Sequence, residues 1–530
     1  MTQSGMIMCL ALLVIFFAVM IAVGFYTRKH ATDVNGFVLG GRSVGPWLTA
    51  FAFGTSYFSA VIFVGYAGQF GWNFGLASTW AGLGNAFIGS LLAWNILGRR
   101  TRIMTQHLDA KTMPDFFGKR FDSSALKIAA SVIVFVFLIP YTASLYNGLS
   151  SLFGIAFDIP YWVIIVVMAV LTGIYVIFGG YMATAINDFI QGIIMLFGIC
   201  AVIGAVISDN GGLVTAMQKL SAVEAEGWAG GAFTSFFGPD PLALLFVVLL
   251  TSLGTWGLPQ MVGKFYSIKS EKDIHKGTII STVFAIIVAG GCYFLGGFGR
   301  LYADKVAYQK DGVTPLFDTV VPSMLTTLPS IIIAVVIVLV LSASMSTLSS
   351  LVLTSSSTLT LDVIKPVIKK NDMTEKQQVT TMRIFIVFFI AMSAVLAIVK
   401  DSFPEFTFIA QMMGVSWGAL AGAFLAPFLY GLYWKGITKA SCVVCFIWGC
   451  GVSVLQLIIT FAKIDISGWG TVLSYLFASS IRSGVLAMVG GLIIVPIVSL
   501  VTKKQDAKVI DEMFECYDEK VEVPVKESLD

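Results

Sequence analysis

The sequence predicts an all-α protein that crosses a membrane about thirteen times. Of its 530 residues, 57% are hydrophobic and only 12% are charged, whereas about 25% of the residues of soluble domains are charged. Windows of about 20 mostly apolar residues, the length that spans a bilayer, recur along the whole chain. We therefore expect a multi-pass protein of the cell membrane without a separate soluble domain.

The first window, from Met6 to Tyr26, is longer than the 7 to 15 apolar residues of a signal peptide and has no basic residue before it. We therefore expect a retained helix. The thirteen windows start near Met6, Trp47, Leu76, Leu126, Tyr161, Met182, Leu242, Thr278, Ser330, Ile384, Thr407, Ser441 and Thr471.

The basic residues indicate the orientation, because cytoplasmic loops are enriched in Lys and Arg. Thirteen spans with the N-terminus outside and the C-terminus in the cytoplasm leave few of the 33 Lys and Arg outside. The net charge of +3 thus reflects loop placement, and we expect no nucleic-acid partner. The basic residues placed outside are Lys219, Arg300, Lys305, Lys310, Lys400, Lys463 and Arg482.

Two spans contain residues that interrupt helices at mid-membrane. The second has Gly54 beside Thr55, and the seventh has Gly254, Gly257 and Pro259. Proline removes a backbone donor and glycine weakens a helix, and unwound backbone inside a membrane is tolerated where it lines a cavity or is buried in protein. Interrupted helices at matching places in two halves point to a transporter binding site.

Spans two to six and seven to eleven each form a five-helix unit that opens with a broken helix, and the odd number inverts the second unit. The predicted organisation is a first helix and cytoplasmic loop (1–45), a first repeat (46–208), an extracellular loop (209–239), a second repeat (240–434), two further spans (435–502) and a poorly ordered cytoplasmic tail (503–530).

The ninth span carries an unusual number of hydroxyls, in the stretch SASMSTLSS (342–350). On a helical period Ala343, Ser346, Thr347 and Ser350 share one face. Hydroxyls and free carbonyls are ligands for hard cations. The alternative is that the hydroxyls bond to carbonyls of their own helix or hold neighbouring helices together.

Five stretches together resemble the sodium:solute symporter family, whose members include sodium/proline, sodium/pantothenate and sodium/monocarboxylate symporters. They occur in the family's order over nearly the whole chain: GFVLGGRSVGPW (36–47), GTSYFSAVIFVGYAG (54–68), GGYMATAINDFIQG (179–192), GTWGLPQMVGKFYSIKS (254–270) and SASMSTLSS. The resemblance implies a LeuT-like inverted-repeat core and a co-transported sodium ion between spans two and nine. The implied sodium ligands are the carbonyls of Thr55, Phe58 and Ala343 and the hydroxyls of Ser346 and Thr347.

Two charged residues have two interpretations each. Asp188 in span six is either an interfacial residue facing the cytoplasm or a residue of an ion relay or second sodium site. Arg42 is either part of an inner gate or an ordinary cytoplasmic anchor.

The solute is expected beside the two breaks, where we expect no buried Lys or Arg. A carboxylate there would rely on the N-termini of half-helices. Proline-transporting relatives have an aspartate at the position of Tyr57 and an aromatic residue at that of Thr251, so the motifs resemble the pantothenate and monocarboxylate members more. The candidate solute contacts are Tyr57, Ser59, Tyr141, Thr255, Trp256 and Pro259.

The sequence thus predicts a sodium-coupled symporter that imports a small organic solute, an organic acid or an amino acid, by alternating access. The alternatives are a passive channel and a membrane sensor that binds solute without moving it. No nucleophile and base pair, metal cluster or phosphate-binding loop of suitable spacing occurs, so we expect no enzyme activity.

Overall fold

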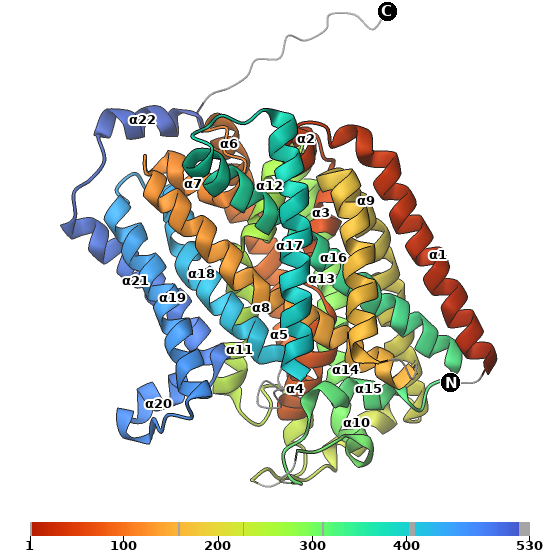
Figure 1. The fold of residues 1–530 in the computed structure, drawn as a ribbon. Coiled ribbons are helices and arrows are strands. Elements are labelled where there is room, and N and C mark those ends of the chain that lie inside the picture. The colour runs from red at the N-terminus through yellow and green to blue at the C-terminus, as the bar shows by residue number, and fades with distance from the viewer. Residues whose placement is uncertain (1–2, 157–159, 226, 310–311, 402–408, 519–530) are drawn as a thin grey trace, which may run out of the picture.

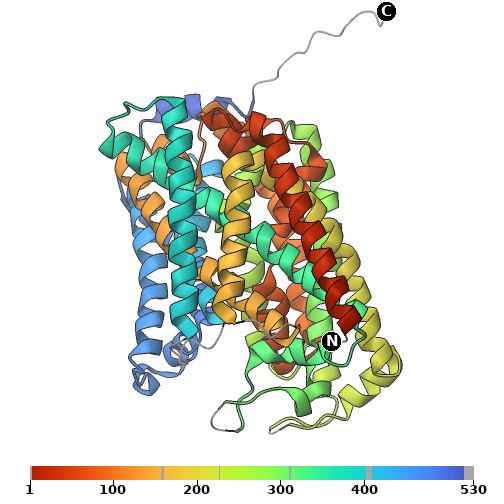
Figure 2. The same cartoon turned by 45° about the vertical axis from the view of Figure 1, so that its right-hand side comes forward.

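Long helices run side by side between two opposite faces of the molecule (Figures 1 and 2). The computed structural model describes residues 3–156, 160–225, 227–309, 312–401 and 409–518, and these are nearly all helical outside the connecting loops. The long helices are α1 (Gln3–Thr27), α8 (Ser124–Ala156), α9 (Tyr161–Asp209), α11 (Pro241–Gly257), α13 (Glu271–Ala285), α16 (Ser330–Leu359), α17 (Glu375–Asp401), α18 (Ile409–Tyr433), α19 (Lys439–Phe461) and α21 (Ser480–Val501).

Shorter helices make up the rest. They are α2 (Val34–Leu39), α3 (Pro46–Thr55), α4 (Ala67–Phe74), α5 (Thr79–Gly84), α6 (Arg99–His107), α7 (Met113–Arg120), α10 (Leu213–Ser221), α12 (Pro259–Ser267), α14 (Gly291–Gly296), α15 (Val320–Leu325), α20 (Thr471–Phe477) and α22 (Ala507–Glu515). Wider π-helical turns join several of them, including Val61–Tyr66, Asn85–Leu92 and Thr360–Ile368.

The described residues contain ten helices that are long and apolar enough to cross a membrane, or eleven when the bent pair α11 and α12 counts as one span. Two of the ten, Val61–His107 and Trp162–Asp209, have 47 and 48 residues, about twice the length that a bilayer needs. Each contains a glycine with positive φ, at Gly75 and Gly180. Splitting both at these glycines would raise the number, and thirteen stays a prediction.

Gly180 sets the reversal inside α9. Its φ of 54° and ψ of −144° suit glycine alone, and an added Cβ would lie 2.9 Å from the Phe37 carbonyl oxygen. We expect Gly180→Ala to lower the free energy of unfolding by about 1–3 kcal/mol, which is measured as a lower melting temperature of the purified protein. Gly173→Ala in the same helix is the control, because its added Cβ meets only Ile390 at 3.4 Å. Equal melting temperatures for the two variants would contradict this prediction.

Several predicted starts differ from the observed ones. The helices expected near Thr278 and Ile384 begin earlier, at Glu271 and Glu375, because a hydropathy window misses polar first turns such as the one that the Ser270 side chain caps. The last span begins at Ser480, since α20 from Thr471 is a separate short helix. Thr407 lies outside the described residues.

Both predicted helix breaks are present. The second span consists of α3, an unwound segment at 56–59 and the helical segment from Val61 to α4. In the seventh span, Leu258 separates α11 from α12, which are bent by 47°. Pro259 is the first residue of α12, a position where the missing N–H costs nothing.

The glycines beside the breaks allow close packing. A Cβ on Gly54 would lie 2.5 Å from the Phe284 ring, and one on Gly254 would lie 2.9 Å from the Trp417 ring. These aromatic side chains therefore pack directly against the backbone of the broken spans, which keeps the breaks buried in protein.

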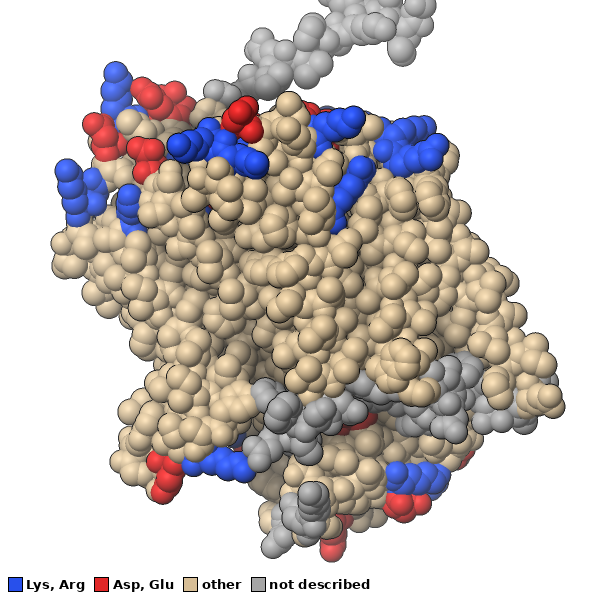
Figure 3. All heavy atoms as spheres, in the orientation of Figure 1, with Lys and Arg blue, Asp and Glu red and all other residues tan. Residues whose placement is uncertain are grey.

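Charged side chains gather near two opposite ends of the molecule, with a broad uncharged band between them (Figure 3). α1 starts at the end that carries α10 and α20, whereas α6, α7 and α22 lie at the other end (Figure 1). The tail (503–530) was predicted to be poorly ordered. In its described part, up to residue 518, α22 packs against the body through Ile510 and Phe514, which are 3% and 7% exposed, and residues 519–530 lie outside the described residues. Ile510 and Phe514 are four residues apart and therefore share one face of α22, which explains why this face packs.

Candidate functional site

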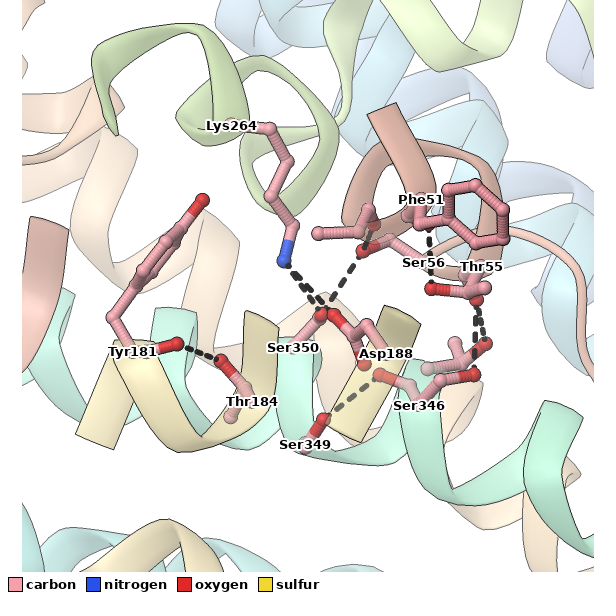
Figure 4. A network of polar contacts seen from close by, with 12 residues as sticks. Phe51, Thr55, Ser56, Tyr181, Thr184, Asp188, Lys264, Ser346, Ser349 and Ser350 are labelled. Carbon is pink, nitrogen blue, oxygen red and sulfur yellow. Dashed lines mark hydrogen bonds and ion pairs between the residues drawn. The ribbon is translucent and has the colours of Figure 1, made fainter. Parts of the chain in front are cut away.

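The end of α3 and the middle of α16 meet at a cluster of five oxygen-bearing residues, which we call the oxygen cluster: Thr55, Phe58, Ala343, Ser346 and Thr347. The Thr347 hydroxyl lies 3.0 Å from the Thr55 carbonyl oxygen, 3.2 Å from that of Phe58 and 3.1 Å from that of Ala343. The Ser346 hydroxyl lies 3.2 Å from the Thr55 oxygen and 3.0 Å from the Ala343 oxygen (Figure 4).

The oxygen cluster contains more acceptors than protons. Five close oxygen pairs involve only two hydroxyl groups, and each hydroxyl has one proton to donate. All five residues are fully buried, so the cluster lies away from bulk solvent. A monovalent cation at this point would be ligated by three carbonyl and two hydroxyl oxygens, which suits a hard ion.

The alternative interpretation, that these hydroxyls bond to carbonyls of their own helix, accounts for only some of their contacts. Both side chains do bond to the Ala343 carbonyl of their own helix, as helix-bound hydroxyls often do. Yet both also reach the Thr55 carbonyl on a different span. Because Thr55 ends α3, its carbonyl lacks the usual helical donor and is free for other partners.

Three of the predicted solute residues present unpaired hydroxyls. Tyr57, Ser59 and Tyr141 are at most 1% exposed, and none of their hydroxyls has a partner in full hydrogen-bond geometry among the described residues. The Tyr141 hydroxyl is, however, close enough to the Ser59 hydroxyl and the Trp417 indole to interact with both. The Tyr141 ring meets the Trp417 ring edge-on, with centroids 6.1 Å apart. The Trp417 indole N–H is buried as well, and it too has no partner in full hydrogen-bond geometry in the described part of the chain. The sequence analysis missed Trp417, because nothing in α18 marks it apart from other apolar residues.

The other predicted solute residues lie elsewhere. The Thr255 hydroxyl donates to the Gly89 and Ser252 carbonyls, and the Trp256 indole N–H donates to the Ile88 carbonyl, so both side chains point toward the third span. Pro259 lines a separate small cavity of about 50 Å³ on the side of α6 and α7. Gln260, beside it, is 2% exposed, and neither polar atom of its amide has a hydrogen-bond partner within the ranges that the structure describes.

Asp188 does not face the cytoplasm, which overturns the interfacial interpretation. It is fully buried in α9, and one carboxylate oxygen lies 3.6 Å from the Lys264 ammonium (Figure 4). The expectation that no buried Lys or Arg lies near the breaks was also wrong, since Lys264 is 3% exposed. The sequence prediction missed Lys264 because it placed this residue in a loop. In the structure Lys264 lies in α12, the second half of the broken span.

Arg42 joins three segments at the α6 end of the molecule. Its guanidinium donates to the carbonyls of Thr105, Ala110 and Tyr266, at 3.2, 2.8 and 3.3 Å. Burial lowers the pKa of Arg42 from its ordinary value, and Asp109 partly offsets this effect. The contacts tie α12 to the α6 region, as an inner gate would require.

A second set of buried charges lies near the same end. Lys127 in α8 is 2.7 Å from Asp115 and 3.1 Å from Asp362, and the Thr112 hydroxyl donates to Asp362 at 2.5 Å. Burial by itself would raise the pKa of Asp115, but the ammonium groups of Lys127 and Lys119 outweigh it and hold that pKa below its ordinary value. The sequence analysis missed this cluster.

Two solved structures are similar to this chain over most of their length. The chain is similar to a Na⁺-coupled sialic acid symporter in a substrate-bound outward-open state, with a TM-score of 0.73 and 18% identity over 94% of this chain and 98% of that one. It is also similar to a manganese transporter of Eremococcus coleocola, with a TM-score of 0.51 and 13% identity over 86% and 95% of the two chains. The LeuT-like fold predicted from the sequence is therefore confirmed.

Sequence comparison gives relatives over most of the chain. The osmoregulated proline transporter OpuE of Bacillus subtilis (strain 168) is 28% identical over 493 residues, 92% of this chain and 94% of the relative. A sodium/proline symporter of Staphylococcus aureus (strain JH9) is 29% identical over 446 residues, 82% of each chain.

These relatives are transporters and not enzymes. Residues 37–449 match the sodium:solute symporter family, which spans both broken helices, Asp188 and the oxygen cluster. The chain is therefore a multi-pass, sodium-coupled transporter, and it belongs to the sodium:solute symporter family.

Proposed function

We propose that the chain imports a small organic solute together with sodium, and that the oxygen cluster is where the sodium ion binds. The observation that carries the proposal is the excess of five close oxygen contacts over two hydroxyl protons at a fully buried point. A cation removes that conflict, because each carbonyl and hydroxyl then directs a lone pair at the ion.

The oxygen cluster lies between two spans that belong to different repeats, and each span contributes one side, or wall, of the cluster. Thr55 and Phe58 belong to the broken second span, and Ser346 and Thr347 belong to the ninth. A bound ion would hold these walls together, and its loss would release them, which is the coupling that alternating access needs. In this proposal the Arg42 contacts close the α6 side, which is the cytoplasmic side, while the site is open outward.

The driving force is sufficient for accumulation. One sodium ion entering down a membrane potential of about 100 mV gains roughly 2.3 kcal/mol, and a tenfold concentration gradient adds roughly 1.4 kcal/mol. Together these support several hundredfold accumulation of a neutral solute moved one to one.

For the solute, we propose an organic acid, such as pantothenate or a monocarboxylate, or an amino acid, such as the proline that the relatives' names give. The hydroxyls of Tyr57, Ser59 and Tyr141 and the indole N–H of Trp417 are buried, and none of them meets a partner in full hydrogen-bond geometry among the described residues. Burying such groups is costly unless a ligand pairs with them. A carboxylate supplies several acceptor lone pairs for these donors.

A thermal-shift screen tests this proposal. Purified protein is heated with amino acids, sugars, vitamins and short carboxylates, each with sodium and with potassium. A true solute binds the folded protein and stabilises it by about 2.7 kcal/mol at a hundredfold excess over Kd. This stabilisation raises the melting temperature, and we expect the rise only in sodium. If no organic acid or amino acid stabilises the protein in sodium, the proposed solute class is wrong.

Trp417→Phe separates the solute site from the sodium site. The substitution removes the indole N–H and keeps most of the apolar contact with Gly254 and Tyr141. Losing one hydrogen bond to a charged solute costs about 1.5–3 kcal/mol, so we expect the solute KM to rise by about tenfold to a hundredfold. The sodium concentration for half-maximal uptake should not change. A rise in that concentration with an unchanged solute KM would contradict the assignment.

Counterflow of labelled solute distinguishes a carrier from a channel. A carrier exchanges labelled for unlabelled solute faster than net efflux, because both pass through one alternating site, whereas a channel shows no such acceleration. Solute binding with neither uptake nor exchange would instead favour the sensor.

A further inference from the structure

Lys264 places a positive charge inside the protein next to the oxygen cluster. It lies in α12, directly after the break at Leu258, and its side chain is 4% exposed. A buried lysine is rare because removing an ammonium from water is costly. The side chains around Lys264 must therefore supply polar or negatively charged partners for its ammonium.

The ammonium is surrounded on three sides. It donates to the Ser350 hydroxyl at 3.0 Å, lies 3.6 Å from the Asp188 carboxylate and lies 5.2 Å from the centre of the Tyr181 ring (Figure 4). These are a hydroxyl, a carboxylate and an aromatic face, all of which stabilise a cation. The three partners come from α16 and α9, so the ammonium joins the broken seventh span to two helices of the core.

A chain of hydroxyls connects this ammonium to the oxygen cluster. Ser350 lies one turn after Ser346 in α16, and its hydroxyl is 2.9 Å from that of Ser56. Ser56 in turn donates to the Ala52 carbonyl, so Ser350 accepts from Lys264 and donates to Ser56. Each hydroxyl proton in this chain then has one acceptor, in contrast to the oxygen cluster beside it.

Without the ammonium, the same place would be a pocket of oxygen ligands around a buried charge. Asp188 would keep a carboxylate with no counter-charge, and the Ser350 hydroxyl would regain the lone pair that accepts from Lys264. A hard monovalent cation is the species that such ligands bind. The lysine head group is compact and carries one charge, like such an ion.

We propose that Lys264 is a cation held by the chain itself, which occupies the pocket of Asp188 and Ser350 and thereby limits coupling to one sodium ion per solute. This inference rests on the proposed sodium site at the oxygen cluster. It assigns Asp188 the role of counter-ion to Lys264 in place of a second sodium site. Lys264 is thus a residue that determines stoichiometry and does not itself bind the solute.

The test counts sodium ions in wild-type protein and in Lys264→Ala. Sodium and solute uptake are measured in the same proteoliposomes, and melting temperature is titrated with sodium. For the wild type we expect about one sodium per solute, and for Lys264→Ala about two, with the Hill coefficient rising accordingly. The double variant Lys264→Ala with Asp188→Asn removes the carboxylate, and we expect it to return to about one sodium.

Two further variants control for charge and folding. Lys264→Arg keeps a positive charge, so its sodium count should match the wild type. Lys264→Met fills the space of the lysine stem. If Lys264→Ala yields no folded protein, the same sodium measurements are made on Lys264→Met. A sodium count in Lys264→Met that equals the wild-type count overturns the proposal.

The outcomes separate this inference from the proposed function. A wild-type flux ratio of two sodium ions per solute overturns the inference without any variant. So does a count that stays at one in Lys264→Ala, including the case in which that variant loses only solute affinity, which would make Lys264 a solute contact. If the wild type shows no stabilisation by sodium at all, the proposed sodium site itself fails.

Discussion

Thr347→Ala is expected to abolish sodium-driven accumulation of the solute. The Thr347 hydroxyl lies within 3.2 Å of carbonyl oxygens from Thr55, Phe58 and Ala343, more of the oxygen cluster than any other side chain reaches among the described residues. Removing it takes away one ligand of the proposed sodium site and leaves a small void between α3 and α16. Uptake into proteoliposomes with an inward sodium gradient is the measurement.

The size of the effect follows from the loss of one ligand to an ion. A polar contact with a charged group is worth about 1.5–3 kcal/mol, so the sodium concentration for half-maximal uptake should rise about tenfold to a hundredfold. At physiological sodium the site would then be largely empty. The solute should still exchange at high sodium, because Tyr57, Tyr141 and Trp417 are unchanged.

Ser344→Ala is the matched control. Ser344 lies in the same helix and is as buried as Thr347, but its hydroxyl has no partner among the described residues. We expect its sodium dependence to equal that of the wild type. Sodium dependence that is unchanged in Thr347→Ala, or lost equally in Ser344→Ala, would remove the oxygen cluster as the sodium site.

Local sequence patterns predicted the helix breaks and the shared hydroxyl face, whereas the five residues of the oxygen cluster were named through the resemblance to the family. Helix breaks depend on glycine and proline within a few residues, and the shared face of Ser346 and Thr347 depends only on helical period. The resemblance to the family then joined the two segments. The structure brings these five residues within hydrogen-bond distance without any contact that the motifs had left out.

Trp417 and Lys264 could not be found in this way. Trp417 matters because Gly254, far away in the sequence, leaves room for its ring, and such an approach has no local signal. Lys264 was counted with the cytoplasmic loops, where basic residues belong by default. The one available hint was that Met261, Val262, Phe265 and Tyr266 around it are apolar or aromatic, which is unusual for a loop.

The buried charges around Lys127 were missed for a similar reason. Lys127 is near the start of α8, and Asp362 is near the end of the ninth span, where each residue alone reads as an interfacial charge. In the structure they meet, with side-chain exposures of 22% for Lys127, 8% for Asp115 and 0% for Asp362. The cluster therefore ties α7, α8 and the segment Thr360–Ile368 together.

Lys127→Met is expected to destabilise the folded protein strongly. The substitution keeps most of the side-chain volume but leaves the carboxylates of Asp115 and Asp362 close together with little compensation. Removing one partner of a buried ion pair costs about 3–5 kcal/mol, which should lower the melting temperature by several degrees. Scans of the purified protein at one fixed heating rate measure the difference, since large proteins often unfold irreversibly.

Two companion variants separate charge from packing in this cluster. Lys119 also contacts Asp115, at 3.2 Å, but its side chain is 39% exposed, so Lys119→Met should cost less than about 1 kcal/mol. Adding Asp362→Asn to Lys127→Met removes the fully buried charge and should restore part of the lost stability, because an amide still accepts the Thr112 hydrogen bond. If Lys127→Met melts like the wild type, or if the second substitution lowers the melting temperature further, the lysine is not the counter-ion that holds these three helical segments together.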